Sequence, residues 1–121
     1  MTATQDHELA ARPEDLSDLF LTRANARDVE GIVALYEPGA ILALPGGGTV
    51  SGHREIRKFY TTLLAVRSSF GSRGQRAALR NGELALTSTR LPSGDTTVEV
   101  ARCQPDGSWL WTIDQPALLS S

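Results

Sequence analysis

Three turn sequences divide the second half of the chain into short segments, and they limit the possible folds more than any other feature. They are Asn81-Gly82, Pro92-Ser-Gly-Asp95 and Pro105-Asp-Gly107. Asn-Gly is the strongest short hairpin signal, and Pro and Gly mark tight turns. Between two of these turns the side chains alternate in type over residues 84–90, which is typical of strands with one buried face. The pattern predicts antiparallel strands over residues 77–80, 84–90, 96–104 and 109–114.

The first half of the chain has helical periodicity instead. Pro13, Glu14 and Asp15 suit a helix start, since proline and acidic residues are favoured in the first turn. This helix should fade near residues 25–27. Asp28 is a suitable N-cap for a short second helix, which carries Tyr36 on its apolar face and stops at Pro38-Gly39.

Two short strands and a longer helix follow. Residues 40–44 are apolar and bounded by turn residues, so we expect a buried strand, and residues 49–51 form a second, brief one. A third helix begins at Ser51 or Gly52 and carries a wide apolar stripe. The stripe consists of Ile56, Phe59, Tyr60, Leu63 and Leu64. Residues 68–75 are a polar Ser/Gly/Arg stretch and predict a loop.

This order of elements predicts an α+β domain with helices on one face of an antiparallel sheet. We expect a cone-shaped barrel, in which a curved antiparallel sheet wraps round a long helix and two further N-terminal helices lie beside it. A cone with apolar walls favours a small-molecule site. Residues 1–12 are expected to be a disordered lead-in, and residues 13–121 a single domain.

Charge and composition exclude several classes of function. Twelve Lys and Arg against fourteen Asp and Glu give a net charge of -2, whereas nucleic-acid binding requires a basic surface. The longest apolar runs have about five residues, while a membrane helix needs ~20. The polar start has no signal-peptide core, so we expect a cytoplasmic protein with no membrane or nucleic-acid partner. One cysteine and two histidines predict neither a disulfide nor a metal site.

Two segments resemble a known group of proteins. The segment from Asp28 to Ala40 (DVEGIVALYEPGA), with Pro45, Gly52 and the run from Ile56 to Tyr60 (IRKFY), resembles the nuclear transport factor 2-like superfamily. Within it, the nearest groups are the ketosteroid isomerases and the SnoaL-like polyketide cyclases. The segment from Gln104 to Pro116 (QPDGSWLWTIDQP) is similar to uncharacterised bacterial members. The resemblance implies the cone-shaped α+β fold and a homodimer formed through the outer face of the sheet.

The resemblance also implies roles for single positions. The isomerases use an aspartate base just before a proline on the first strand, and this position is Leu44. Their hydrogen-bond donor to the oxyanion matches Phe20, two supporting tyrosines match Tyr36 and Tyr60, and the acid beside the oxyanion falls near Glu99. Leucine cannot take a proton and phenylalanine cannot donate a hydrogen bond. The resemblance therefore argues against steroid isomerisation by the usual mechanism.

Four charged residues lie on neighbouring predicted strands: Arg90, Glu99, Arg102 and Asp114. They form either a buried network that holds a ligand or shuttles a proton, or a salt-bridge ladder on the outer face. Glu99 and Arg102 have opposite parity on one strand, so both face the cavity only if a bulge intervenes.

The last strand carries two tryptophans. Strict alternation places Trp109, Trp111 and Ile113 on one face and Asp114 on the other. The tryptophan face lines either the pocket or the dimer interface.

Three further features could have either a functional or a purely structural role. His53, beside the glycine-rich loop after Pro45, is either a general base at the cone mouth or a solvated surface residue. Cys103 is interpreted as a half-buried strand residue without a role. The loop itself lacks the lysine of a phosphate-binding loop, so we interpret it as a flexible rim.

We therefore expect a cofactor-free protein that binds a small organic ligand in an apolar cavity. One hypothesis is an isomerase, cyclase or hydrolase that acts by proton transfer, and the other is a non-catalytic ligand-binding or accessory dimer. The candidate catalytic residues are Tyr36, Tyr60, Glu99 and Asp114. The candidate substrate-binding residues are Phe20, Leu44, Phe59, Arg90, Arg102 and Trp111.

Overall fold

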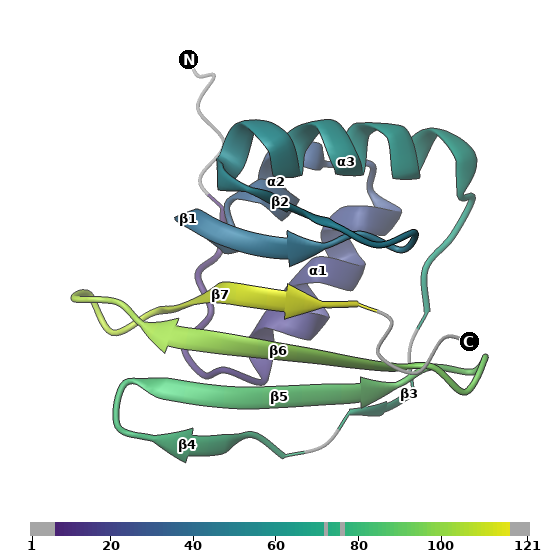
Figure 1. Ribbon diagram of the computed structural model, residues 1–121. Helices are drawn as coiled ribbons and strands as arrows, with labels where there is room; N and C mark the ends of the chain where they lie inside the picture. Colours follow the sequence, from purple (N-terminus) through teal and green to yellow (C-terminus); the bar gives the residue numbers. More distant parts are fainter. Residues whose placement is uncertain (1–6, 72, 76, 117–121) are drawn as a thin grey trace.

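The computed structural model describes residues 7–71, 73–75 and 77–116 and has the predicted α+β class (Figure 1). The helices are α1 (Asp15–Asn25), α2 (Val29–Val33) and α3 (Gly52–Val66). The strands are β1 (Tyr36–Ala43), β2 (Thr49–Ser51), β3 (Arg73–Gln75), β4 (Leu79–Asn81), β5 (Leu84–Arg90), β6 (Thr96–Cys103) and β7 (Trp109–Gln115).

The strands form one open sheet in the order β2-β1-β7-β6-β5-β3, and β4 also pairs with β5. Strands β5, β6 and β7 are the predicted antiparallel meander, whereas β1 and β7 run parallel. Parallel neighbours require a long connection, and here most of the chain lies between them. The sheet is therefore mixed rather than antiparallel. It also does not close into the expected barrel, because the short strands β2 and β3 lie at opposite edges.

Helices α1 and α3 cover one face of this sheet and leave the other face open (Figure 1). The buried residues of α3 are Ile56, Tyr60 and Leu64, spaced four apart, so they lie on one side of the helix. This side packs against β1 and β2, while α1 contacts β7. The covered face of the sheet and the two helices enclose the space in which the candidate site lies.

The second helix is shorter than predicted, and the first strand begins earlier. Asp28 caps α2 as expected, since its Oδ1 accepts a hydrogen bond from the Gly31 amide at 2.9 Å. Tyr36, however, opens strand β1, which continues through Pro38. A proline is tolerated in a strand at irregular positions, and the pairing of β1 with β7 shifts between Tyr36 and Ile41. Tyr36 therefore lies beside β7 and not on a helix.

Residues 7–12 pack against the domain, so the expected lead-in is wrong for this part. Ala10 is buried and forms a bridge with Trp109. Nε2 of His7 lies 3.0 Å from Oδ2 of Asp28. The buried guanidinium of Arg23 donates to the carbonyl oxygens of Glu8 and Gly31. A buried charge requires such acceptors, and residues 7–12 supply one of them. Residues 1–6 of the expected lead-in lie outside the described residues.

Part of the predicted polar loop forms a strand. Arg73–Gln75 pair with β5 as strand β3, and the strand predicted over residues 77–80 is found at Leu79–Asn81. Strand propensity depends strongly on pairing context, which a polar Ser/Gly/Arg stretch does not reveal. Across the described ranges, no helix is long and apolar enough to span a membrane.

Candidate functional site

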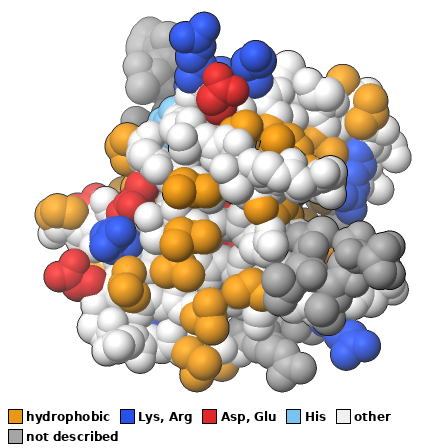
Figure 2. Space-filling view, viewed as in Figure 1, with side chains coloured by type: hydrophobic (Ala, Val, Ile, Leu, Met, Phe, Trp, Pro, Cys, Tyr) orange, Lys and Arg blue, Asp and Glu red, His pale blue; other side chains and the backbone are white. Residues whose placement is uncertain are grey.

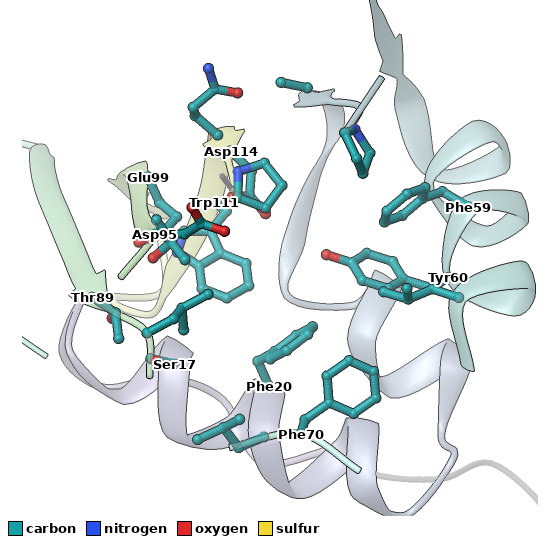
Figure 3. A pocket seen from close by; sticks show the side chains of 18 of the residues that line it. Ser17, Phe20, Phe59, Tyr60, Phe70, Thr89, Asp95, Glu99, Trp111 and Asp114 are labelled. Atoms are coloured by element: carbon teal, nitrogen blue, oxygen red, sulfur yellow. The ribbon is translucent and has the colours of Figure 1, made fainter. Parts of the chain in front are cut away.

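A cavity of about 450 Å³ lies between the covered face of the sheet and helices α1 and α3 (Figure 3). This volume is in the range of small-molecule pockets. All of the chain's Phe and Tyr residues line it, together with one of the two Trp residues. They are Phe20, Tyr36, Phe59, Tyr60, Phe70 and Trp111. The cavity therefore offers a largely aromatic surface to a ligand.

The rings pack against one another around Phe20. The centroid of its ring lies 5.8 Å from that of Tyr60, 6.0 Å from that of Phe70 and 6.2 Å from that of Trp111. These separations and the tilted ring planes are typical of favourable aromatic pairs. Figure 3 shows Phe20, Phe59, Tyr60 and Phe70 facing the carboxyl groups of the strands across the cavity. The site thus has an aromatic side and an acidic side.

A chain of hydrogen bonds joins the two sides. The Tyr36 hydroxyl donates to Oδ2 of Asp114 at 2.5 Å, and the hydroxyl oxygens of Tyr36 and Tyr60 are 2.7 Å apart. Because Tyr36 has a single hydroxyl hydrogen and gives it to Asp114, Tyr60 donates to Tyr36. These three residues come from β1, α3 and β7, so the chain depends on the assembled fold.

Glu99 lies directly opposite Asp114 on the neighbouring strand. Both side chains are buried, with exposed fractions of 8% for Glu99 and 5% for Asp114, and both line the cavity. The Thr87 hydroxyl on β5 donates to Oε1 of Glu99 at 2.6 Å. No described Lys or Arg forms a salt bridge with either carboxyl group.

This environment favours the protonated forms of the carboxyl and hydroxyl groups in the site. Burial, together with the negative charge of Glu99, raises the pKa of Asp114 to about 8, although the hydrogen bond from Tyr36 acts in the opposite direction. Burial also raises the pKa of Glu99, against hydrogen bonds from Thr87 and Thr97. Burial raises the pKa values of Tyr36 and Tyr60 well above the ordinary value. The negative charge of one carboxyl group opposes the ionisation of the other, so the two groups titrate as a coupled pair.

A β-bulge places Asp114 in the cavity. Val100 pairs with Ile113 and Ala101 pairs with Trp111, so Thr112 is an extra residue on β7. A bulge of one residue reverses the faces of the side chains that follow it. Asp114 therefore points to the same side as Trp111, and Ile113 is half exposed on the outer face. Our prediction from strict alternation was wrong for both residues.

The two tryptophans lie on the covered face but differ in their surroundings. Trp111 lines the cavity, 5.2 Å from the Tyr36 ring. Trp109 is buried beside Ala10, and the Arg80 guanidinium lies 5.0 Å from its ring. Neither tryptophan reaches the outer face, so they do not form the interface that we considered for them.

The structure separates the four charged strand residues. Glu99 and Asp114 meet in the cavity, whereas Arg90 and Arg102 are exposed and do not line it. Arg102 is bonded through Nε to Oε2 of Glu37 at 2.9 Å. No bulge lies between Glu99 and Arg102 in the pairing of β6 with β5, so their side chains point to opposite faces of the sheet. Of the four residues, only the two acids are buried as in the first alternative, and the two arginines are surface residues.

The remaining predicted wall residues line the cavity: Phe20, Leu44 and Phe59. Leu44 and Phe20, which the resemblance matches to the isomerases' base and donor, contribute apolar side chains to the cavity wall. Nε2 of His53 lies 2.7 Å from the Tyr36 carbonyl oxygen, outside the cavity lining. Cys103 is a half-buried free thiol. In the described ranges, no three or more His, Cys, Asp or Glu side chains form a group that could hold a metal ion.

Among the residues that the sequence analysis missed, Phe70 and Asp95 line the cavity, and Thr87 donates a hydrogen bond to Glu99. The contact of Thr87 with Glu99 could have been predicted from the sequence. A turn at residues 92–95 pairs Arg90 with Thr96, and counting back three residues along each strand pairs Thr87 with Glu99. Asp95 belongs to the turn itself and carried no periodic signal. Phe70 was assigned to a polar loop, and only the folded chain brings it to Phe20.

Comparison with known proteins gives a consistent result. The model of the SnoaL-like domain matches residues 18–115. The structure of a ketosteroid isomerase-like protein from Erwinia carotovora atroseptica is 17% identical, with a TM-score of 0.72 over 89% of this chain and 94% of that one. A SnoaL-like protein of unknown function from Burkholderia thailandensis is 17% identical, with a TM-score of 0.61 over 84% and 90%. At these identities the structures show a shared fold. No curated protein matches the sequence.

Proposed function

Because this chain belongs to the SnoaL-like family, we propose that it binds an apolar small molecule in its cavity and catalyses a proton transfer on that molecule. The observation that carries the proposal is the pair of buried carboxyl groups, Glu99 and Asp114, beside the tyrosine chain. A carboxyl group with a raised pKa that faces a cavity is typical of an acid–base site.

The two carboxyl groups have complementary roles in this proposal. With one of the two groups protonated, the ionised member accepts a proton from the ligand, while the protonated member donates a hydrogen bond to the negative charge that develops. A neutral carboxylic acid in an apolar site is an effective donor of this kind. The aromatic surface excludes water and holds the apolar body of the ligand. Isomerisation and cyclisation are the reactions that this arrangement serves, and hydrolysis would in addition require a water molecule beside the ligand.

A non-catalytic ligand-binding protein is the second candidate. It is favoured by Leu44 and Phe20, which place apolar side chains where the isomerases have a base and a donor. In this case the carboxyl groups only orient the ligand.

The experiment is a proton-exchange assay that needs no knowledge of the product. The protein is incubated in D₂O with cyclic and polycyclic ketones small enough for the cavity, and loss of the proton signal next to the carbonyl group is followed by NMR. We expect exchange with the natural sequence and its loss in Glu99→Gln and Asp114→Asn. The matched control is Glu83→Gln, which alters an exposed carboxyl group in a turn. Ligand binding without exchange would support the second candidate instead.

We also propose a homodimer formed through the outer face of the sheet. An apolar row crosses this face in register, because Leu79 pairs with Leu86, Leu86 with Val100, Val100 with Ile113 and Ile113 with Ile41. Four of these five side chains are large and exposed. Figure 2 shows hydrophobic side chains gathered over the strands on this face. Contiguous exposed apolar surface of this kind favours an interface.

A further inference from the structure

The segment of residues 67–71 follows α3 and forms part of the rim of the cavity. Arg67 and Gly71 are exposed, yet both line the cavity together with Phe70. The Phe70 ring stands edge-on to Phe20 at 6.0 Å, with the ring planes at 87°. The Arg67 guanidinium lies over the Phe70 ring, 4.4 Å from its centroid. Phe70 is thus the rim residue that reaches the aromatic core of the site.

One side chain of α1 binds both backbone polar groups of Phe70. Nδ2 of Asn25 donates to the Phe70 carbonyl oxygen at 3.1 Å, and Oδ1 of Asn25 accepts from the Phe70 amide at 2.9 Å. The two bonds use the donor and the acceptor of the amide group. They fix both backbone polar groups of a residue that lies in no helix or strand.

The turn that follows α1 adds a second support for the segment of residues 67–71. Arg27 has a φ of 62° and is the one described non-glycine residue with a positive φ. Its guanidinium donates to the carbonyl oxygens of Leu64 and Ser68. A left-handed backbone is unfavourable for a side-chain residue and is retained where the surroundings require it. Here it accompanies an arginine that binds the start of the rim segment.

We propose that Asn25 is a positioning residue that sets the size of the ligand the cavity admits, because it fixes Phe70 in the cavity wall. This inference rests on the proposed function only in requiring that the cavity binds a ligand. Asn25 itself is exposed and does not line the cavity, so it acts through Phe70. With Asn25 shortened, the rim segment loses both bonds to Phe70, and the ring no longer closes the wall beside Phe20.

The experiment measures the binding of 4-n-alkylphenols, from ethyl to octyl, by isothermal calorimetry. In the natural sequence, affinity should fall once the alkyl chain exceeds the space bounded by Phe70. In Asn25→Ala, the preference for ethyl over octyl should decrease by about tenfold or more. The same change should appear in Phe70→Ala, and adding Asn25→Ala to Phe70→Ala should change the preference no further. Asn81→Ala, the same substitution at the exposed end of β4, should leave it unaltered.

Amide exchange separates this proposal from the proposed function. We expect the Phe70 amide of the ligand-free protein to exchange faster in Asn25→Ala than in Asn81→Ala. Three results would overturn the proposal: an unaltered exchange rate in Asn25→Ala, an unaltered size preference in Asn25→Ala, or additive effects of Asn25→Ala and Phe70→Ala on that preference. If no phenol binds the natural sequence, ligand binding by the cavity is contradicted, and so is the assigned role in ligand size. A lack of proton exchange on ketones, by contrast, bears only on the catalytic proposal.

Discussion

At the scale of single residues, Asp114 contributes to the dependence of stability on pH. In the folded protein its pKa is raised from 3.8 to about 8, so the folded state keeps a proton that the unfolded state has released. Linkage then requires the free energy of unfolding to fall as pH rises between these two values. For one proton, the slope is at most about 1.4 kcal/mol per pH unit.

The variant Asp114→Asn removes this titration. We expect its free energy of unfolding, relative to the natural sequence, to increase steadily from pH 5 to pH 8 in urea denaturation. Asp106→Asn is the control, because hydrogen bonds from Ser108 lower the pKa of this exposed carboxyl group and it stays ionised over the whole range. Its difference from the natural sequence should be constant. A constant difference for Asp114→Asn as well would show that Asp114 is ionised in the folded protein.

The two tyrosines of the site should differ in their contribution to stability. Tyr36→Phe leaves both the Asp114 carboxyl group and the Tyr60 hydroxyl without their partner, and unsatisfied buried groups cost about 1–3 kcal/mol. Tyr60→Phe removes one donor but keeps the bond from Tyr36 to Asp114, so a loss of about 0.5–1.5 kcal/mol is expected. Urea unfolding at pH 6 measures both. An equal or larger loss for Tyr60→Phe would contradict the direction of donation described here.

At the scale of elements, the junction of α1 and α2 is packed so closely that one glycine is required. A Cβ at Gly31 would lie 2.3 Å from Oδ2 of Asp28 and 2.9 Å from Cδ of Arg23. Gly to Ala inside a helix normally stabilises, but here the added methyl group would displace the N-cap and the buried arginine. We expect Gly31→Ala to reduce the free energy of unfolding by about 1–3 kcal/mol.

Gly39→Ala provides the matched comparison. Gly39 lies in β1, and nothing approaches within 4 Å of a Cβ built there. Its substitution should change stability by no more than about 0.5 kcal/mol. Thermal and urea unfolding of the two variants would measure the contrast directly. A neutral Gly31→Ala would mean that Asp28 and Arg23 adjust without cost.

The elements also show what the sequence can predict. The turns at residues 81–82, 92–95 and 105–107 predicted the meander, because glycine and proline restrict the backbone locally. The positions of Tyr36 and Asp114 depend on irregular pairing of β1 with β7 and on the extra residue Thr112 in β7. Such shifts are set by contacts between distant strands, so local periodicity placed Tyr36 on a helix and Asp114 on the wrong face. The four candidate acid–base residues named from the sequence all line the cavity, but the pairing that brings them together there was not predicted.

At the scale of the whole molecule, the two faces of the open sheet differ in what covers them. The helices cover one face and enclose the cavity, and the apolar row from Leu79 to Ile41 crosses the other. The bulge at Thr112 sets which residue of β7 lies on which face, so that Ile113 points outward and Asp114 points into the cavity. An interface on the outer face can therefore be changed without altering the cavity lining.

This separation makes the dimer testable by itself. We expect the natural sequence to sediment at twice the chain mass and Ile113→Lys to be monomeric, because a lysine in the middle of the apolar row would be buried without a partner. Val66→Lys, at the end of α3 and 79% exposed, should remain dimeric. A monomeric natural sequence at micromolar concentration would contradict the interface. The described residues of a single chain enclose the cavity between the sheet and the helices, so we expect the monomeric variant still to bind ligand, and loss of binding would show that the second chain supports the site.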